Sequence, residues 1–135
     1  MAKIDLFVNF EKNISFEVSE DIYNSFQKCS SDLNPLHTDE LFAKNKGFQN
    51  KVMYGNILNA FISYAIGMEL PTSDVMLQLQ DIQYKKPVYL HDKLVMNLKT
   101  EEVHEAVNVV VFIYKFTNAK NKVVAKGRVQ IGVFE

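Results

Sequence analysis

The chain has 135 residues, of which 47% are hydrophobic, and its 15 basic residues nearly balance 16 acidic ones. This length suits one domain with its own core, so residues 1–135 are expected to form a single domain. The net charge of -1 and the scattered lysines offer no basic stripe for phosphates, so we expect no nucleic acid partner.

The N-terminus indicates neither a signal peptide nor a membrane span. Lys3, Asp5 and Asn9 interrupt its apolar residues, whereas a spanning helix needs about 20 predominantly apolar residues in a row. The single Cys29 cannot form an internal disulfide, which agrees with a reducing compartment. We therefore expect a cytoplasmic protein without membrane association.

A first helix is predicted to begin after Ser19, a favourable N-cap, and to end near Ser30. Its apolar residues Ile22, Phe26 and Cys29 recur at helical spacing. We therefore expect Cys29 to be a core residue rather than a nucleophile.

A second, shorter helix is expected to open at Asp39-Glu40, with Asp39 as its cap and Gly47 as its C-cap. Between the two helices, Asp32 and His37 stand five residues apart on either side of Asn34-Pro35. This turn signal disfavours helix before the proline and lets the two side chains converge. A carboxylate beside a neutral imidazole can hold a water molecule and take its proton.

The next segment, Tyr54 to Met68, is apolar around most of its circumference and has no charged residue before Glu69. Such a helix must be buried. Gly55 begins it, and a helix N-terminus offers unpaired N–H groups that glycine lets a ligand approach closely. Those donors could stabilise negative charge that develops on an oxygen atom of a bound ligand during a reaction.

After Pro71 the pattern changes to the alternation of half-buried strands. Four strands are predicted in succession, at 75–79, 94–98, 107–113 and 123–133. A polar turn at 118–121 precedes the last one, so an antiparallel meander is the simplest arrangement. The result is an α+β fold, and the long apolar strand 107–116 would leave an unprotected edge, which predicts a homodimer.

Taken alone, Asp32 and His37 also fit a helix cap and a solvated loop histidine. The surrounding motif, however, resembles a known family. Asp32-x-Asn34-Pro35-x-His37-x-Asp39, followed by Gly47-Phe48 and Gly55, resembles the signature of MaoC-like (R)-specific enoyl-CoA hydratases and 3-hydroxyacyl-thioester dehydratases. The stretch 84–92, with its Pro-Val pair, resembles a second family segment. The resemblance implies a hot-dog fold, an antiparallel sheet wrapped around a long central helix, in which two subunits usually join their sheets.

The resemblance also implies roles for single residues. Asp32 and His37 would be the acid/base pair and Gly55 the oxyanion-hole donor. Asn34 is expected to serve the turn and to help shape the site. Ser63, eight residues after Gly55, would lie near the pair, although a bond to its own helix backbone is an equally good explanation.

Three positions depart from the family. Many members have glycine where this chain has Ser31 and His91, and histidine where it has Tyr54. Tyr54 is expected to line the acyl pocket and to change which acyl groups fit. His91 tolerates a left-handed turn better than most residues, so the fold should survive.

The sequence thus favours a cofactor-free hydro-lyase that adds water reversibly to a trans-2-enoyl thioester to give the (R)-3-hydroxyacyl thioester. The carrier could be coenzyme A or an acyl carrier protein. No metal site is expected, since no pair of cysteines or His-x-x-x-His spacing occurs. A hot-dog thioesterase is the first alternative, but the central helix lacks the carboxylate those enzymes commonly use. A non-catalytic acyl-binding or assembly subunit is the second.

Overall fold

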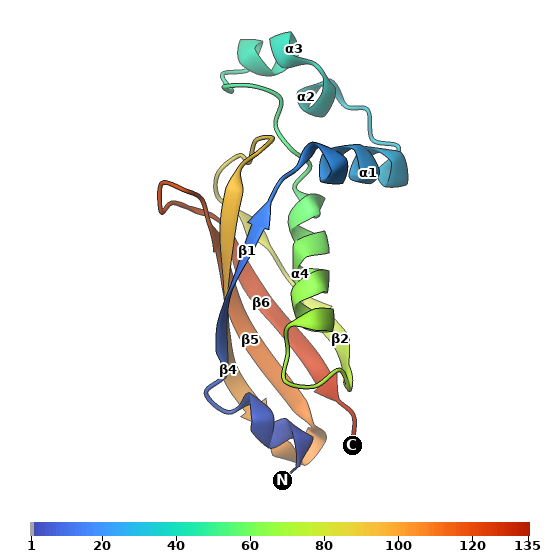
Figure 1. Cartoon of the computed structure of the whole chain (residues 1–135), viewed down its shortest axis with the longest axis vertical. Coiled ribbons are helices and arrows are strands. Elements are labelled where there is room, and N and C mark those ends of the chain that lie inside the picture. Colours follow the sequence, from blue (N-terminus) through green and yellow to red (C-terminus); the bar gives the residue numbers. More distant parts are fainter. Residues whose placement is uncertain (1) are drawn as a thin grey trace.

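The computed structural model describes residues 2–135, in which one long helix packs against a six-stranded antiparallel sheet (Figure 1). The helices are α1 (Glu20–Ser30), α2 (Pro35–Thr38), α3 (Glu40–Asn45) and α4 (Asn56–Met68), with short 3-10 turns η1 (Lys3–Phe7) and η2 (Glu105–Val107). The strands are β1 (Glu11–Glu17), β2 (Val75–Gln80), β3 (Gln83–Tyr84), β4 (Lys93–His104), β5 (Val109–Thr117) and β6 (Val123–Val133). None of these helices is long and apolar enough to cross a bilayer.

The strand order is β1-β4-β5-β6-β2, and β3 also pairs with β6. All four predicted strands exist, and β4, β5 and β6 form the expected antiparallel meander. The prediction that β2 belongs to the same meander is wrong, because β2 lies against β6 instead of β4. The short connection after α4 brings the chain to the free edge of β6, and the chain reaches β4 only after β3 has also paired with β6.

Strand β1 is absent from the sequence-based prediction. Only Ile14 among its residues is buried, so charged and polar side chains hide the alternation.

The prediction that strand 107–116 forms an unprotected edge is also wrong. Strand β5 lies between β4 and β6, and its first expected residue, Val107, belongs to η2. The edges are β1 and β2, and β2 exposes Met76, Leu77 and Leu79.

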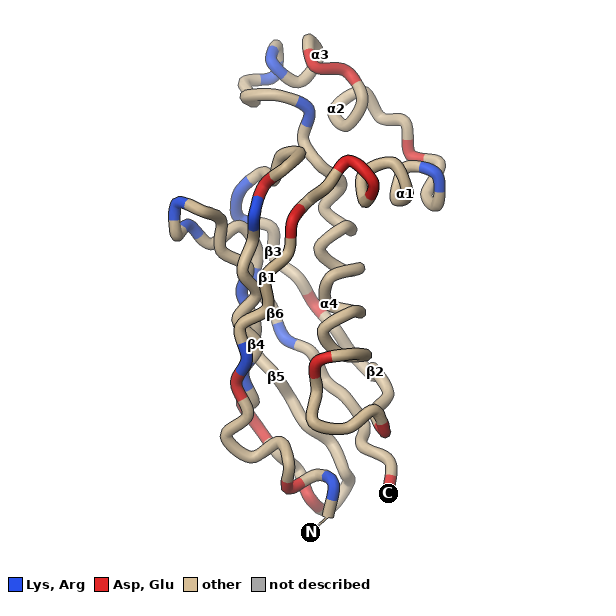
Figure 2. Tube along the Cα trace, viewed as in Figure 1, with Lys and Arg blue, Asp and Glu red and all other residues tan. Residues whose placement is uncertain are grey.

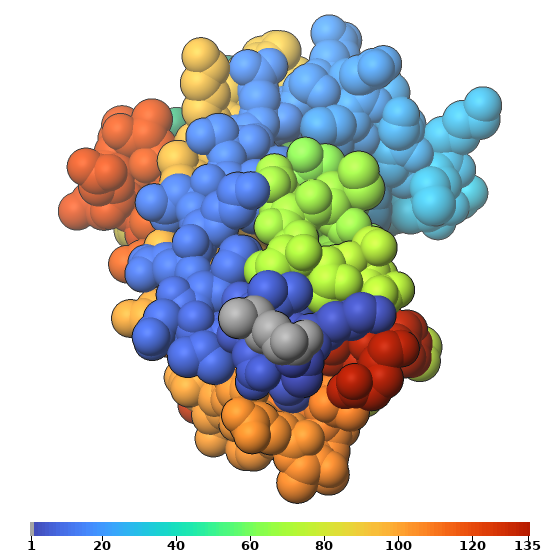
Figure 3. Space-filling view, turned by 60° about the horizontal axis from the view of Figure 1, so that its bottom comes forward, coloured from blue at the N-terminus to red at the C-terminus, as the bar shows by residue number. Residues whose placement is uncertain are grey.

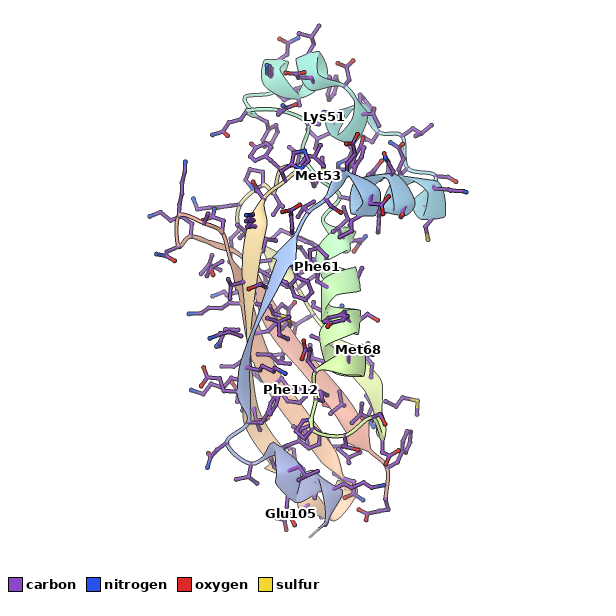
Figure 4. All side chains as sticks on the ribbon, in the orientation of Figure 1. Lys51, Met53, Phe61, Met68, Glu105 and Phe112 are labelled. Carbon is purple, nitrogen blue, oxygen red and sulfur yellow. The ribbon has the colours of Figure 1, made fainter. Side chains whose placement is uncertain are left out.

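The core lies between α4 and the sheet. Helix α4 carries no charge along its length, as Figure 2 shows, and six of its residues are buried. Phe61 points from α4 toward the sheet (Figure 4) and stacks on Phe16 of β1 with ring centroids 4.3 Å apart. At the lower end, η1 lies between α4 and the β4–β5 turn (Figure 3), and its fully buried Phe7 packs edge-on against Phe112.

Residues 20–53, which we call the helical arm, lie outside this two-layer body at its upper end (Figure 1). Ser19 caps α1 by accepting a hydrogen bond from the Ile22 N–H at 3.2 Å, and Asp39 caps α3 through the Phe42 N–H at 3.1 Å, both as predicted. The prediction of a buried Cys29 is wrong, because this thiol is exposed. Helix α1 runs outward from α4, so its last turn lies beyond the core.

Candidate active site

Local hydrogen bonds fold the segment that joins α1 to α2. Ser31 ends α1 in the left-handed conformation with a φ of 56°. One carboxylate oxygen of Asp32 accepts a hydrogen bond from the Asn34 N–H at 3.0 Å, and the Asn34 side chain caps α2 through the Leu36 N–H at 2.9 Å. His37 therefore lies on a single helical turn that Asn34-Pro35 starts. The prediction that Asn34 serves the turn is confirmed.

The structure brings Asp32 and His37 together. The distance from His37 Nε2 to Asp32 Oδ2 is 4.0 Å, which is too long for a direct hydrogen bond. His37 Nδ1 lies 2.7 Å from the carbonyl oxygen of Val52. Because a carbonyl only accepts, Nδ1 carries the proton in the neutral ring, and Nε2 is left with its lone pair on the side of Asp32.

His37 also lines a cavity of about 350 Å³ at the junction of the helical arm and the body. Its walls are mostly apolar and include His37, Phe48, Tyr54, Gly55, Leu58 and Val88. A larger hollow of about 950 Å³ lies on the outer face of the sheet, but it contains none of the predicted site residues and no histidine. The smaller cavity is the candidate site because an imidazole and a helix N-terminus meet there.

Not every predicted site residue reaches this cavity. His37, Tyr54 and Gly55 line it, whereas Asp32 does not and is connected with it only through its position 4.0 Å from His37 Nε2. Asn34 is exposed and does not line it. Ser63 is exposed on α4, away from the cavity walls, and its hydroxyl makes no hydrogen bond within residues 2–135.

Gly55 precedes the first residue of α4, and its N–H makes no hydrogen bond within residues 2–135. A side chain at this position would collide with Tyr84, since an added Cβ would lie 2.8 Å from Tyr84 Cε1. The close approach that requires glycine is therefore made by the half-exposed ring of Tyr84. Burial raises the pKa of the Tyr84 hydroxyl above its ordinary value.

Tyr54 is almost completely buried, and its ring lies on the imidazole of His37 with centroids 4.3 Å apart. Its hydroxyl donates to the main-chain carbonyl of Asp32 and accepts from the side-chain amide of Gln27 at 3.2 Å. Burial raises the pKa of Tyr54, so the hydroxyl keeps its proton. Tyr54 thus lines the cavity as expected but also contacts both Asp32 and His37, the predicted acid/base pair. Its predicted influence on acyl preference remains a prediction.

The sequence patterns do not identify several residues that lie at the site. Tyr23 donates to the carbonyl of His37 at 2.7 Å, and Gln27 bonds both Tyr23 and Tyr54. Val52 contributes its main-chain carbonyl oxygen, which every residue has, so a sequence pattern cannot identify it. Tyr23 could have been suspected, since it is a hydrogen-bonding aromatic on a half-apolar helix.

The second family-like segment, 84–92, lines one part of the cavity. The lining residues from this segment are Tyr84, Lys85, Lys86, Pro87 and Val88, two of which carry a positive charge. His91 has a φ of 72°, which confirms that histidine accepts the left-handed turn there. The described residues contain no group of three side chains that could hold a metal ion.

Solved structures share this architecture. An (R)-hydratase from Aeromonas caviae matches 93% of this chain and 96% of its own with a TM-score of 0.86 at 20% identity. An R-hydratase from Pseudomonas aeruginosa matches 94% and 81% with a TM-score of 0.85 at 27% identity. The fold is therefore the hot-dog fold expected from the sequence.

Sequence relatives agree with the structural ones. An (R)-specific enoyl-CoA hydratase of Aeromonas caviae is 28% identical over 81 residues, 60% of each chain. A mitochondrial 3-hydroxyacyl-[acyl-carrier-protein] dehydratase of Arabidopsis thaliana is 30% identical over 99 residues, 73% of this chain and 57% of the relative. The chain thus spans little more than half the length of these relatives. The family model of the MaoC like domain matches residues 5–121, most of the chain, and the protein belongs to the MaoC-like family.

Proposed function

We propose that the protein is a hydro-lyase that adds water reversibly to a trans-2-enoyl thioester and gives the (R)-3-hydroxyacyl thioester. The observation that supports this most is the orientation of His37. Its Nδ1–H is held by the Val52 carbonyl, and its basic Nε2 faces Asp32 Oδ2 at 4.0 Å beside a largely apolar cavity. A water molecule between these two atoms can be oriented by the carboxylate and deprotonated by the imidazole.

The reaction then needs a donor for the thioester oxygen. As the water oxygen bonds to C3, the C2=C3 π electrons move toward the carbonyl and its oxygen becomes negative. The free N–H of Gly55 at the start of α4 is suited to stabilise this charge, with help from the helix dipole. The proton taken from water returns to C2, so H and OH are added with no net change in protons. This chemistry requires no redox or group-transfer cofactor, and we propose that none takes part.

The carrier of the acyl group ends its pantetheine arm in a phosphate whether it is coenzyme A or an acyl carrier protein. Lys85 and Lys86 line the cavity and form no ion pair within residues 2–135. We propose that they attract this phosphate. Charge reversal at both lysines should raise KM for either thioester and leave kcat nearly unchanged.

The test is turnover of trans-2-enoyl-CoA and enoyl-acyl-carrier-protein substrates, followed by loss of enoyl absorbance and by product chirality. Asp32→Asn and His37→Gln should each lower kcat by at least about 10²-fold, and their combined effect should be less than the product, since both act on one water. Asp39→Asn is the matched control because asparagine also caps helices well. Turnover by either variant at the wild-type rate would remove the proposed mechanism, and a wild-type protein without turnover on any of these substrates would leave a non-catalytic acyl-binding role.

We also propose a homodimer, now on the basis of β2 instead of β5. Strand β2 is a sheet edge with three exposed apolar side chains, Met76, Leu77 and Leu79. Unpaired edges of this composition favour association. Light scattering at micromolar concentration should give twice the mass of the chain, and Leu77→Lys should shift the mass toward the monomer. A monomeric wild-type protein would contradict this proposal.

A further inference from the structure

Gln27 of α1 lies at the centre of a hydrogen-bond chain that ends on both members of the acid/base pair. Its side-chain amide nitrogen is 3.3 Å from the Tyr23 hydroxyl and 3.2 Å from the Tyr54 hydroxyl. Tyr23 then bonds the main-chain carbonyl of His37, and Tyr54 bonds the main-chain carbonyl of Asp32. One amide group is thereby connected to the backbone at both catalytic positions.

The direction of every hydrogen bond in this chain is fixed by chemistry. The main-chain carbonyls of Asp32 and His37 can only accept, so each tyrosine hydroxyl must donate its single proton to a carbonyl. Each hydroxyl oxygen is then left to accept, and an amide NH₂ supplies the two protons needed. With the Gln27 amide reversed, its oxygen would face two oxygens that have no proton to give. The network therefore has one arrangement of protons.

Aromatic packing completes the connection. The Tyr54 ring contacts Phe26 and Tyr23 on α1, with centroids 5.0 and 5.7 Å away, and His37 at 4.3 Å. Both tyrosines are buried, at 7% and 3% exposure, so water competes little for their hydroxyl groups. By contrast, the Asp32 side chain is about half exposed and lies on a segment with little core of its own.

We infer that Gln27, acting through Tyr23 and Tyr54, is a positioning residue that sets the separation of the Asp32 carboxylate and the His37 imidazole. The inference rests on the proposed role of this pair as the acid and base. Gln27 does not line the cavity and acts only through the two tyrosines. Because general acid/base catalysis depends steeply on distance, loss of this network should lower kcat with little change in KM.

Gln27→Glu is the decisive variant, since it keeps the shape of the side chain but replaces two donors with a carboxylate that only accepts. The carboxylate would draw the hydroxyl protons away from the Asp32 and His37 carbonyls. We expect kcat to fall at least about tenfold and KM to change by less than about threefold. Asn24→Asp adds the same charge to an exposed position of the same helix and is the matched control.

A second readout does not depend on turnover. The imidazole protons of His37, followed by NMR against pH, should titrate with a midpoint that moves in Gln27→Glu and stays in place in Asn24→Asp. Tyr54→Phe, which removes one hydroxyl and keeps the ring, should move the midpoint in the same way and serves if Gln27→Glu does not fold. Its effect on kcat combined with Gln27→Met should be less than the product of the two single effects.

The outcomes separate this inference from the proposed function. If Asp32→Asn abolishes turnover while Gln27→Glu and Tyr54→Phe retain the wild-type kcat and the wild-type His37 midpoint, the positioning role is wrong and the function stands. If Asp32→Asn retains the wild-type turnover, the proposed acid/base role of the pair fails, and the inference fails with it as a statement about catalysis. A fall in kcat together with a moved midpoint in both Gln27→Glu and Tyr54→Phe supports the inference.

Discussion

The body and the helical arm of this protein are held in place by different forces. In the body, α4 and the sheet bury a continuous set of large apolar side chains, among them Phe7, Phe112, Phe116 and Ile62. The helical arm, 20–53, buries only three residues, Tyr23, Ala43 and Met53. Its shape depends on helix caps, the side chain of Asn34 and the hydrogen bonds of two tyrosines.

This difference matters because Asp32 and His37, the proposed acid/base pair, belong to the arm, while Gly55 belongs to the body. Burial of apolar surface is strong but not directional, whereas hydrogen bonds are weaker and fix angles and distances. The body thus supplies stability and a helix N-terminus that is anchored by a buried helix. The arm supplies the orientation of the reacting groups, and substitutions in the two regions should have different consequences.

The largest effect on stability should come from the body. Phe112 is fully buried against Phe7 and Phe10, so Phe112→Ala should lower the free energy of unfolding by about 3–5 kcal/mol. Leu41 in the arm is 72% exposed, and Leu41→Ala should change the free energy of unfolding by less than about 0.5 kcal/mol. Urea denaturation of both variants measures the contrast, and similar losses would mean that the arm has a core of its own.

Hydrogen exchange should also distinguish the helical arm from the body. The amides of His37 and Ala43 are hydrogen-bonded within short helices of the arm, and those of Phe112 and Val129 lie in the central strands. We expect the arm amides to exchange through openings that cost at least about 2 kcal/mol less than the openings of the sheet. Equal protection in both regions would show that they unfold as one unit.

Two glycines at opposite ends of α4 give a smaller, matched comparison. At Gly55 an added Cβ meets the Tyr84 ring at 2.8 Å, so Gly55→Ala should cost about 1 kcal/mol. At Gly67 nothing lies within 4 Å, and Gly67→Ala should stabilise the helix by roughly 0.5–1 kcal/mol. Thermal unfolding gives both values. Addition of Tyr84→Ala should remove the cost at Gly55, and a persistent cost would place the strain elsewhere.

The smallest effect concerns the left-handed residue before Asp32. Ser31 has a φ of 56°, so Ser31→Gly should raise the unfolding free energy by about 0.5–1 kcal/mol. Ser25→Gly, on an exposed helical position of α1, should lower it by a similar amount, about 0.5–1 kcal/mol. Destabilisation by both changes would mean that the Ser31 side chain has a role of its own.

The sequence predicts the body well where packing imposes a period. Strands β4, β5 and β6 have buried residues on one face, and α4 has no charge, so the alternation and the apolar run are unmistakable. Strand β1 was missed because only Ile14 is buried. The place of β2 beside β6 depends on tertiary pairing, about which a local pattern says nothing.

In the arm, the turn and the caps are predictable because side chains of Asn34 and Asp39 make them locally. The prediction of a buried Cys29 is wrong because helical spacing identifies a face of α1 but does not indicate where the core beneath that face ends. Gln27 and the Val52 carbonyl could not be found, since a lone polar side chain and a main-chain oxygen carry no periodic signal.

One property of the tyrosine contacts applies to proteins other than this one. The hydroxyls of Tyr23 and Tyr54 bond the main chain at positions 37 and 32, and they ignore which side chains stand there. An exchange of those side chains therefore leaves these two hydrogen bonds possible, although it removes the contacts of the Asp32 carboxylate with Asn34 and of the His37 ring with Val52. Hydrogen bonds of this kind let evolution, or a protein engineer, try new reactive groups at positions 32 and 37 while Tyr23 and Tyr54 still hold the main chain there.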